Sequence, residues 1–221
     1  LRDAADARTG TANALPGEAR GIAHQLAENF AALDRATLPL PEKIGPQIRA
    51  LKQFGVWFGR RTVYLPKLLR PDAAALLTLL WGIWTKKEAP PAAPTPGLTS
   101  FDVDKGADVA ALHAGGFTVV GGRAIRFDML ERLEDELEKA LSSGSDAETL
   151  LGRIVSLLGS GKEEARNVLA ALGWKSVEVA NAAPVFRRAR EKPARRDKPK
   201  KPERPVDPDS PFARLAVLKV K

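Results

Sequence analysis

A proline-rich segment, TKKEAPPAAPTPG at residues 85–97, is the feature that most constrains how this chain can fold. Its four prolines and its few large apolar residues favour an extended, semi-rigid spacer. We therefore expect two modules, at residues 1–87 and 98–186, joined by a linker at 88–97. A chain of 221 residues is long enough for one or two domains of this kind.

The first module is expected to be helical with one hairpin. Pro16 and a helical spacing of apolar residues predict a helix from residue 16 to about residue 35. A shorter helix is expected over 47–54. The run VWFGRRTVYL predicts a β-hairpin over about 56–65. PDAAALLTLLWGIW, from Pro71, predicts a helix that is buried on most of its surface.

The second module is expected to mix helices and strands. LTSFDV and FTVVGGRAIRF predict a strand and a tight hairpin, and Asp128 is expected to cap a leucine-rich helix. Two capping boxes, Ser145 with Glu148 and Ser160 with Glu163, predict two further helices. The strand KSVEV follows them. The fold class is therefore mainly α with small β-hairpins, an α+β protein.

The last three predicted helices and KSVEVANAAPVFRRAR have the order of a winged-helix module. In that arrangement residues 161–172 would form the helix presented to nucleic acid, and the strands after it would form the wing. The helix carries Lys162 and Arg166 beside two glutamates, so a packing role is the alternative. The fold prediction for 98–186 therefore includes a winged-helix-like form.

Basic charge is concentrated in two segments. The chain has a formal net charge of +8, of which residues 43–71 carry +7 without a single acid and residues 187–204 carry another +7. The remaining residues therefore sum to −6. Two basic segments on a mildly acidic background are typical of a protein that binds a polyanion.

The candidate nucleic-acid-binding residues come from these two segments. Arg60 and Arg61 lie at the expected hairpin turn, where phosphate contact is predicted, whereas Trp57, Phe58 and Tyr64 are expected in the core rather than stacked on bases. The other candidates are Lys67, Arg70, Lys52, Arg187, Arg188, Arg190, Arg195 and Arg196.

Residues 187–210 are too polar to bury anything and are expected to be a disordered basic tail, with a soluble spacer as the alternative role. The apolar segment at 211–221 is expected to form a short terminal helix. Its partner-docking candidates are Phe212, Leu215 and Leu218, and a frayed end is the alternative.

No catalytic or metal-binding residue is predicted. The chain has no cysteine, and its two histidines, His24 and His113, lack metal-ligand spacing. GSGKEEA resembles a phosphate-binding loop, but Ser156 and Glu163 replace the glycine and the hydroxyl residue that such a loop requires. The acids between residues 131 and 138 are expected to be a solvated helix face. The longest apolar run is too short to span a bilayer, and no signal peptide is found.

Several long motifs carry a family resemblance. ARGIAHQLAENFAALDR, QIRALKQFGVWFGRRTVYLPKLLRPDAAALLTLLW, GLTSF and GGRAIRFDMLERLEDEL are followed by DPDSPFARLAVLK. In this order, over about residues 15–218, they resemble the C-terminal region of bacterial superfamily-two helicases similar to the mitochondrial degradosome (Suv-type) RNA helicase. The chain begins at Leu1 and its only methionine is Met129, so we interpret it as a fragment or processed piece.

The resemblance implies a parent protein with an ATP-driven motor that unwinds RNA or DNA. The motor motifs have no positions in this sequence, so ATP and magnesium are expected only for the parent. We expect this chain to be a non-enzymatic accessory region in the bacterial cytoplasm. It would guide single-stranded RNA or DNA beside the motor, in RNA degradation with a degradosome-type nuclease. The alternative is a protein-interaction or scaffold module that docks a nuclease, a ribosome-associated partner or the motor domains. No membrane partner is expected.

Overall fold

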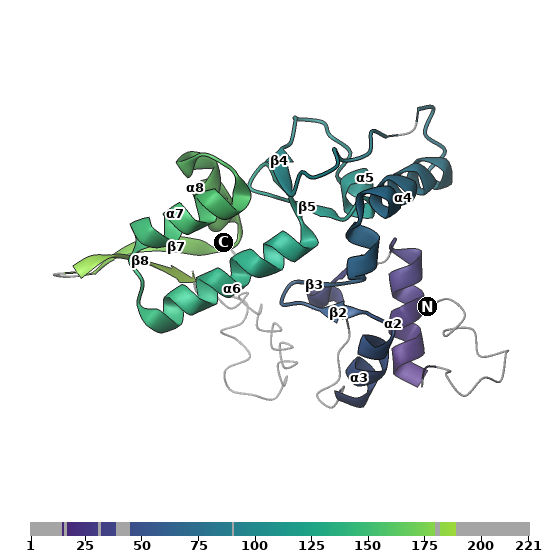
Figure 1. Cartoon of the computed structure of the whole chain (residues 1–221), viewed down its shortest axis with the longest axis horizontal. Helices are drawn as coiled ribbons and strands as arrows, with labels where there is room; N and C mark the ends of the chain where they lie inside the picture. The colour runs from purple at the N-terminus through teal and green to yellow at the C-terminus, as the bar shows by residue number, and fades with distance from the viewer. Residues whose placement is uncertain are drawn as a thin grey trace, which may run out of the picture. The chain divides into compact units, whose positions relative to one another are not determined.

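The computed structural model describes residue 15 and residues 17–30, 32–38, 45–89, 91–179 and 182–188. Within these residues the fold is α+β, as predicted: α-helices combine with small antiparallel sheets (Figure 1). The helices are α2 (Gly17–Glu28), α3 (Gly45–Gln53), α4 (Pro71–Trp84), α5 (Val109–Ala114), α6 (Phe127–Ser143), α7 (Ala147–Leu158) and α8 (Lys162–Ala171), with 3-10 turns η2 (Arg35–Thr37) and η3 (Pro66–Leu69). The strands are β1 (Ala32–Asp34), β2 (Trp57–Phe58), β3 (Thr62–Tyr64), β4 (Ser100–Asp102), β5 (Phe117–Val120), β6 (Arg123–Arg126), β7 (Trp174–Val179) and β8 (Ala182–Arg188).

The first sheet has the strand order β1-β3-β2, and α2 and α3 pack beside it (Figure 1). The prediction of one helix from 16 to 35 is wrong at its C-terminal end, because α2 stops at Glu28 and Phe30 has a φ of 52°. Leu33 then lies in β1, paired with Val63. Helical spacing of apolar residues cannot reveal this strand, because its partner is some thirty residues away.

The predicted hairpin is present as β2 and β3, and its aromatic residues differ in how deeply they are buried. Tyr64 is buried, with its ring centroid 5.9 Å from that of Phe127, and Phe58 packs partly against the core. Trp57 is 54% exposed, so the prediction that the aromatics are in the core is wrong for this residue. The reason is that β2 is an edge strand whose alternate residues point to opposite faces, and Val56 and Phe58 take the inner one.

Helix α4 starts at Pro71 as predicted, but most of its surface is not buried. Its buried residues are the small side chains Ala74, Thr78 and Gly82, which share one face. Five large apolar residues point outward: Leu76, Leu79, Leu80, Ile83 and Trp84. The helix packs through its small face because α5 approaches closely, and a Cβ atom at Gly115 would lie 2.9 Å from the Thr78 Oγ1.

The second sheet has the order β4-β6-β5, and a buried arginine joins it to α7. Arg123 donates hydrogen bonds to the Ser100 Oγ and Asp102 Oδ1, both at 2.5 Å, and to the carbonyl oxygens of Leu158 and Gly159. The side chain is only 6% exposed. Arg123 therefore links two strands to the end of a helix that follows much later in the chain.

Helices α6, α7 and α8 and the β7–β8 hairpin share the largest apolar core, which includes Leu133, Ile154, Leu169 and Trp174. The three helices are present where the sequence predicts them, and the following hairpin completes the order helix, helix, helix, hairpin. Gly173 has a φ of 85° just after α8, which fits the predicted helix-ending role. The winged-helix assignment stays a prediction.

The N-cap residues of these three helices are not the ones that the sequence predicts. Helix α6 starts after Arg126, and Asp128 lies inside its first turn. Asp146, rather than Ser145, caps α7 by accepting the backbone N–H of Thr149 at 2.8 Å. Gly161, rather than Ser160, precedes α8 and provides no side-chain cap. Adjacent polar residues compete for the N-cap position, so local sequence locates such a helix better than it locates the cap.

Residues on both sides of the proline-rich segment contact one another. Lys87 forms an ion pair with Asp108 at 3.1 Å, and the hairpin backbone bonds to α6. The described residues between 15 and 188 belong to one compact unit. The predicted boundary at 88–97 stays a prediction of domain organisation.

Strand β8 also continues to Arg188, so the prediction that the disordered tail begins at 187 is wrong for its first two residues. Arg187 and Arg188 pair in register with Lys175 and Trp174 of β7. A backbone ladder can hold such polar residues in a strand without burying their side chains. The rest of 187–210 and the predicted terminal helix lie outside the described residues.

Candidate nucleic-acid interface

The turn between β2 and β3 is held by one buried carboxylate. Glu131 of α6 is 8% exposed, and it accepts backbone N–H groups from Arg60, Arg61 and Thr62, the last two at 3.0 and 3.1 Å. Gly59 lies directly against the same carboxylate, so a Cβ atom there would collide with it. The backbone around Arg60 and Arg61 is therefore fixed by a residue about 70 positions later in the chain.

The two predicted arginines are also paired through their side chains. Arg61 forms an ion pair with Glu134, which is 2% exposed, and donates to the Leu172 carbonyl oxygen at 3.1 Å. Arg60 pairs with Asp135 at 3.1 Å, and both of these side chains are about half exposed. The prediction of a solvated acidic face on α6 is therefore wrong for Glu131 and Glu134, because the hairpin covers them.

Four arginines meet at one cleft of about 540 Å³, which we call the arginine cleft. Its cationic residues are Arg35, Arg60, Arg61 and Arg188. They come from η2, the hairpin turn and the end of β8. The fold thus brings Arg188 to the same cleft as Arg60 and Arg61, although the sequence placed these residues in separate basic segments.

Part of the lining of the arginine cleft is an apolar wall. Val120, Phe127, Leu130 and Leu172 line it, beside the imidazole of His113. The His113 and Phe127 rings meet edge to face with centroids 5.2 Å apart. Burial lowers the pKa of His113, although the Asp34 carboxylate acts in the opposite direction. The imidazole is therefore neutral at neutral pH.

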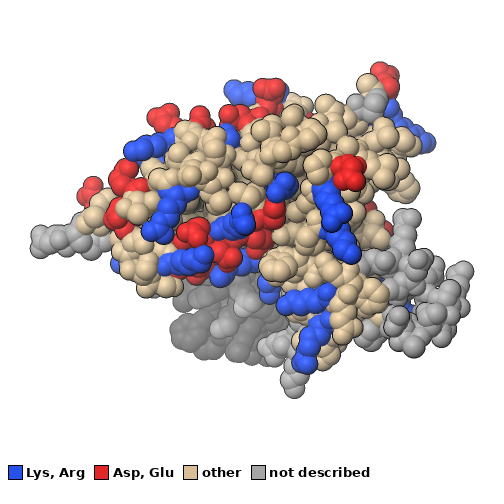
Figure 2. All heavy atoms as spheres, viewed as in Figure 1, with Lys and Arg blue, Asp and Glu red and all other residues tan. Residues whose placement is uncertain are grey.

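The remaining predicted cations lie outside the cleft. Lys52, Lys67 and Arg70 are exposed, and none forms an ion pair with another described residue. Figure 2 shows basic side chains without acidic ones over α3, where Lys52 lies, and alternating charges over α6. Arg187 is exposed on β8. The other candidates, Arg190, Arg195, Arg196, Phe212, Leu215 and Leu218, lie outside the described residues.

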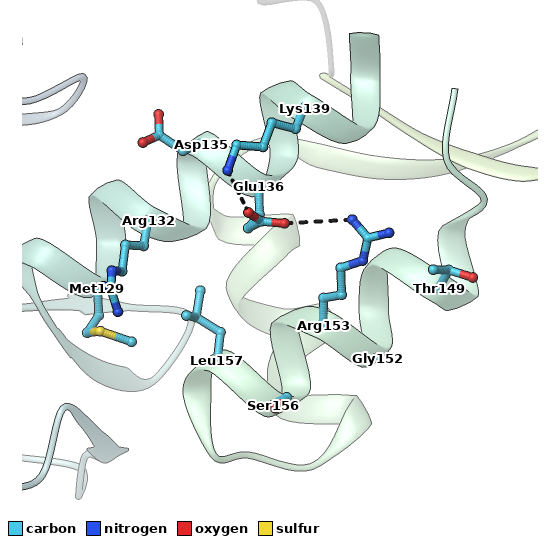
Figure 3. Close-up of a pocket in the computed structure, with 10 residues that line it drawn as sticks. All are labelled: Met129, Arg132, Asp135, Glu136, Lys139, Thr149, Gly152, Arg153, Ser156 and Leu157. Carbon is cyan, nitrogen blue, oxygen red and sulfur yellow. Dashed lines mark hydrogen bonds and ion pairs between the residues drawn. The ribbon is translucent and has the colours of Figure 1, made fainter. Parts of the chain in front are cut away.

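A second and larger hollow, of about 900 Å³, lies between α6 and α7 (Figure 3). Its centre is crossed by ion pairs, because Glu136 binds both Lys139, at 2.9 Å, and Arg153, at 3.7 Å. The charges of Lys139 and Arg153 in this hollow are therefore paired within the protein.

Sequence reasoning missed two residues of the arginine cleft. Arg35 follows an acid, Asp34, and lies outside both basic segments, so charge counting does not single it out. His113 is not among the candidate site residues, because it stands alone in the sequence and lacks metal-ligand spacing. Only the tertiary fold places it in the lining of the same cleft as the four arginines.

Among the described residues, no group of acids and histidines could hold a metal ion, and no helix is long and apolar enough to cross a membrane. Comparisons with protein-family models, curated proteins and solved structures find no match for this chain. The arginine cleft therefore stands as the candidate site on its own geometry.

Proposed function

We propose that this chain binds single-stranded RNA or DNA through the arginine cleft. It would act without catalysis of its own, as an accessory region beside the motor of a superfamily-two helicase in the bacterial cytoplasm. The observation that carries the proposal is the meeting of Arg35, Arg60, Arg61 and Arg188 at one cleft. Arginine is suited to this role because its planar guanidinium group can make two parallel hydrogen bonds to a phosphate.

Exposed cations outside the cleft add further positive charge. Lys52, Lys67 and Arg70 supply positive charge in a stretch, residues 43–71, that contains no acid. Trp57, exposed on the edge strand β2, offers a flat surface for base stacking. Phosphate contacts of this type provide affinity without reading sequence, so we expect binding to be strongly dependent on salt.

The test is fluorescence anisotropy of a labelled single-stranded oligonucleotide with the 221-residue chain over a range of salt concentrations. Arg188→Gln should weaken binding and reduce the salt slope by about 0.7, the value expected for one phosphate contact on a single strand. Arg153→Gln is the matched control, because Arg153 is an exposed arginine in the α6–α7 hollow. Equal losses in both variants, or no binding at low salt, would contradict the proposal.

The outward face of α4 supports a second candidate function, a protein-interaction module. Ile83 and Trp84 are 65% and 79% exposed, and three leucines continue the same apolar surface. A group of exposed large apolar residues on one helix face is typical of a protein contact. The partner classes are the motor domains, a degradosome-type nuclease or a ribosome-associated protein. A pull-down with a purified partner after nuclease treatment, retained by the wild type and lost by Ile83→Lys, would support this candidate over the first.

A further inference from the structure

We propose that the arginine cleft holds one nucleotide unit of the bound strand, with its base against His113 and the apolar wall and its phosphate on the guanidinium groups. The inference rests on the nucleic-acid binding proposed above and specifies the unit that the site accommodates. It differs from a general electrostatic surface, which would contact phosphates alone.

The size and composition of the cleft favour this ligand. Its volume of about 540 Å³ lies within the range of about 300–1,000 Å³ that is typical of small-molecule sites. Val120, Phe127 and Leu172 contribute apolar surface to its lining, and the arginines contribute charged surface. A nucleotide has the same two parts, because it joins a flat base to an anionic phosphate.

The charges in the cleft point to Arg35 and Arg188 as the phosphate ligands. Asp135 and Glu134 already pair with Arg60 and Arg61, respectively. Arg35 and Arg188 form no ion pair within the described part of the chain.

The surroundings of Arg35 hold its guanidinium group in place and leave its charge available. Arg35 donates to the neutral Gly59 carbonyl oxygen at 2.6 Å, which orients the group without cancelling its charge. The acid that lines the cleft, Asp34, uses its Oδ1 to accept the Ala36 backbone N–H at 2.9 Å.

His113 supplies the surface for the base. Its ring is partly buried against Phe127, and its imidazole has no hydrogen-bond partner among the residues that the structure describes. A neutral imidazole carries one donor and one acceptor, so it can bond to the edge of a base or stack on its face. This residue is the feature that distinguishes a nucleotide site from a site for phosphate alone.

The two histidines of the chain provide a direct measurement. His24 lies on α2 with a side chain 67% exposed and does not line the cleft, so it is an internal control for His113. The imidazole NMR signals of the 221-residue chain would be followed during titration with AMP, UMP and inorganic phosphate. His24→Gln assigns the two signals.

We expect AMP and UMP to move the His113 signal to saturation while His24 stays unchanged. Inorganic phosphate should bind about tenfold more weakly or worse, because it lacks the base. Arg188→Gln should weaken AMP binding about tenfold, the loss typical of one charged hydrogen bond, and Arg35→Gln is a second variant with the same expectation. Arg153→Gln should leave AMP binding unchanged.

Each negative result would contradict a different part of the two proposals. Salt-dependent oligonucleotide binding without any His113 response to AMP or UMP would overturn the nucleotide site and leave the proposed function standing. Equal binding of phosphate and AMP would also overturn it, because the base would then have no role. AMP binding without oligonucleotide binding would overturn the proposed function and support a site for a free nucleotide. Absence of both would overturn both.

Discussion

Replacing Glu131 by alanine is expected to destabilise the chain strongly, because this carboxylate joins the hairpin to α6. Its two oxygens accept the N–H groups of Arg60, Arg61 and Thr62 while the residue is 8% exposed. Alanine would leave these donors without their acceptor and leave a cavity beneath the turn. The effect should therefore reach beyond α6 to the position of both turn arginines.

The size of the stability loss depends on whether water can reach each N–H donor that loses its acceptor. Arg60 is exposed, so water can replace the carboxylate at its N–H, whereas Thr62 is only 6% exposed and Arg61 is partly buried. Each buried donor left unsatisfied costs about 1–3 kcal/mol. With two such donors, the expected loss in the free energy of unfolding is about 2–6 kcal/mol for Glu131→Ala. Glu131→Gln keeps one acceptor oxygen and should lose less.

Urea denaturation followed by far-UV circular dichroism and tryptophan fluorescence measures this loss. Asp135→Ala is the matched control on the same helix, because it removes only the exposed ion pair with Arg60 and should cost about 1 kcal/mol or less. A Glu131→Ala loss no larger than the control loss would refute the argument that the buried carboxylate holds the hairpin.

Other predictions concern single contacts elsewhere in the fold. Gly59→Ala should destabilise by about 1–3 kcal/mol in the same assay, because the added methyl group meets the Glu131 carboxylate. Arg123→Met should cost about 1–3 kcal/mol, because it leaves the buried Ser100 hydroxyl and the Leu158 carbonyl oxygen without their donor, while Asp102 is largely exposed to water; an unchanged urea midpoint would contradict this. Asp146→Ala should cost about 1 kcal/mol through loss of the α7 cap. Burial lowers the pKa of His113, so the unfolded chain binds more protons than the folded chain below about pH 6.5. The free energy of unfolding should therefore fall as the pH drops below about 6.5. His113→Gln should flatten this pH dependence, which urea titrations at several pH values would measure.

Local patterns in the sequence predicted most of the elements. The glycine pair before Arg123, the apolar spacing of α6 and the β-rich runs around Gly59 each indicate an element from neighbouring residues alone. The errors occur where an element depends on a distant partner. Strand β1 exists because Val63 and its neighbours pair with it, and Leu33 looked helical only because its spacing also fits a helix.

Part of the candidate site was also predictable from local sequence. Charge counting found Arg60, Arg61 and Arg188, because clustered basic residues are visible in the sequence. It could not show that these residues share a cleft with Arg35 and His113, since they come from four separate parts of the chain. It also could not show that carboxylates of α6 form ion pairs with Arg60 and Arg61.

By itself, the sequence determined the α+β class, the order of the helices and hairpins and the basic character of two segments. These properties follow from residue spacing and charge, which are local. The tertiary structure alone decided that Glu131 and Glu134 are buried, that the apolar residues of α4 face outward, and that four arginines and His113 line one cleft. These properties depend on contacts between residues far apart in the chain, and the packing of whole elements determines which face of each helix is covered.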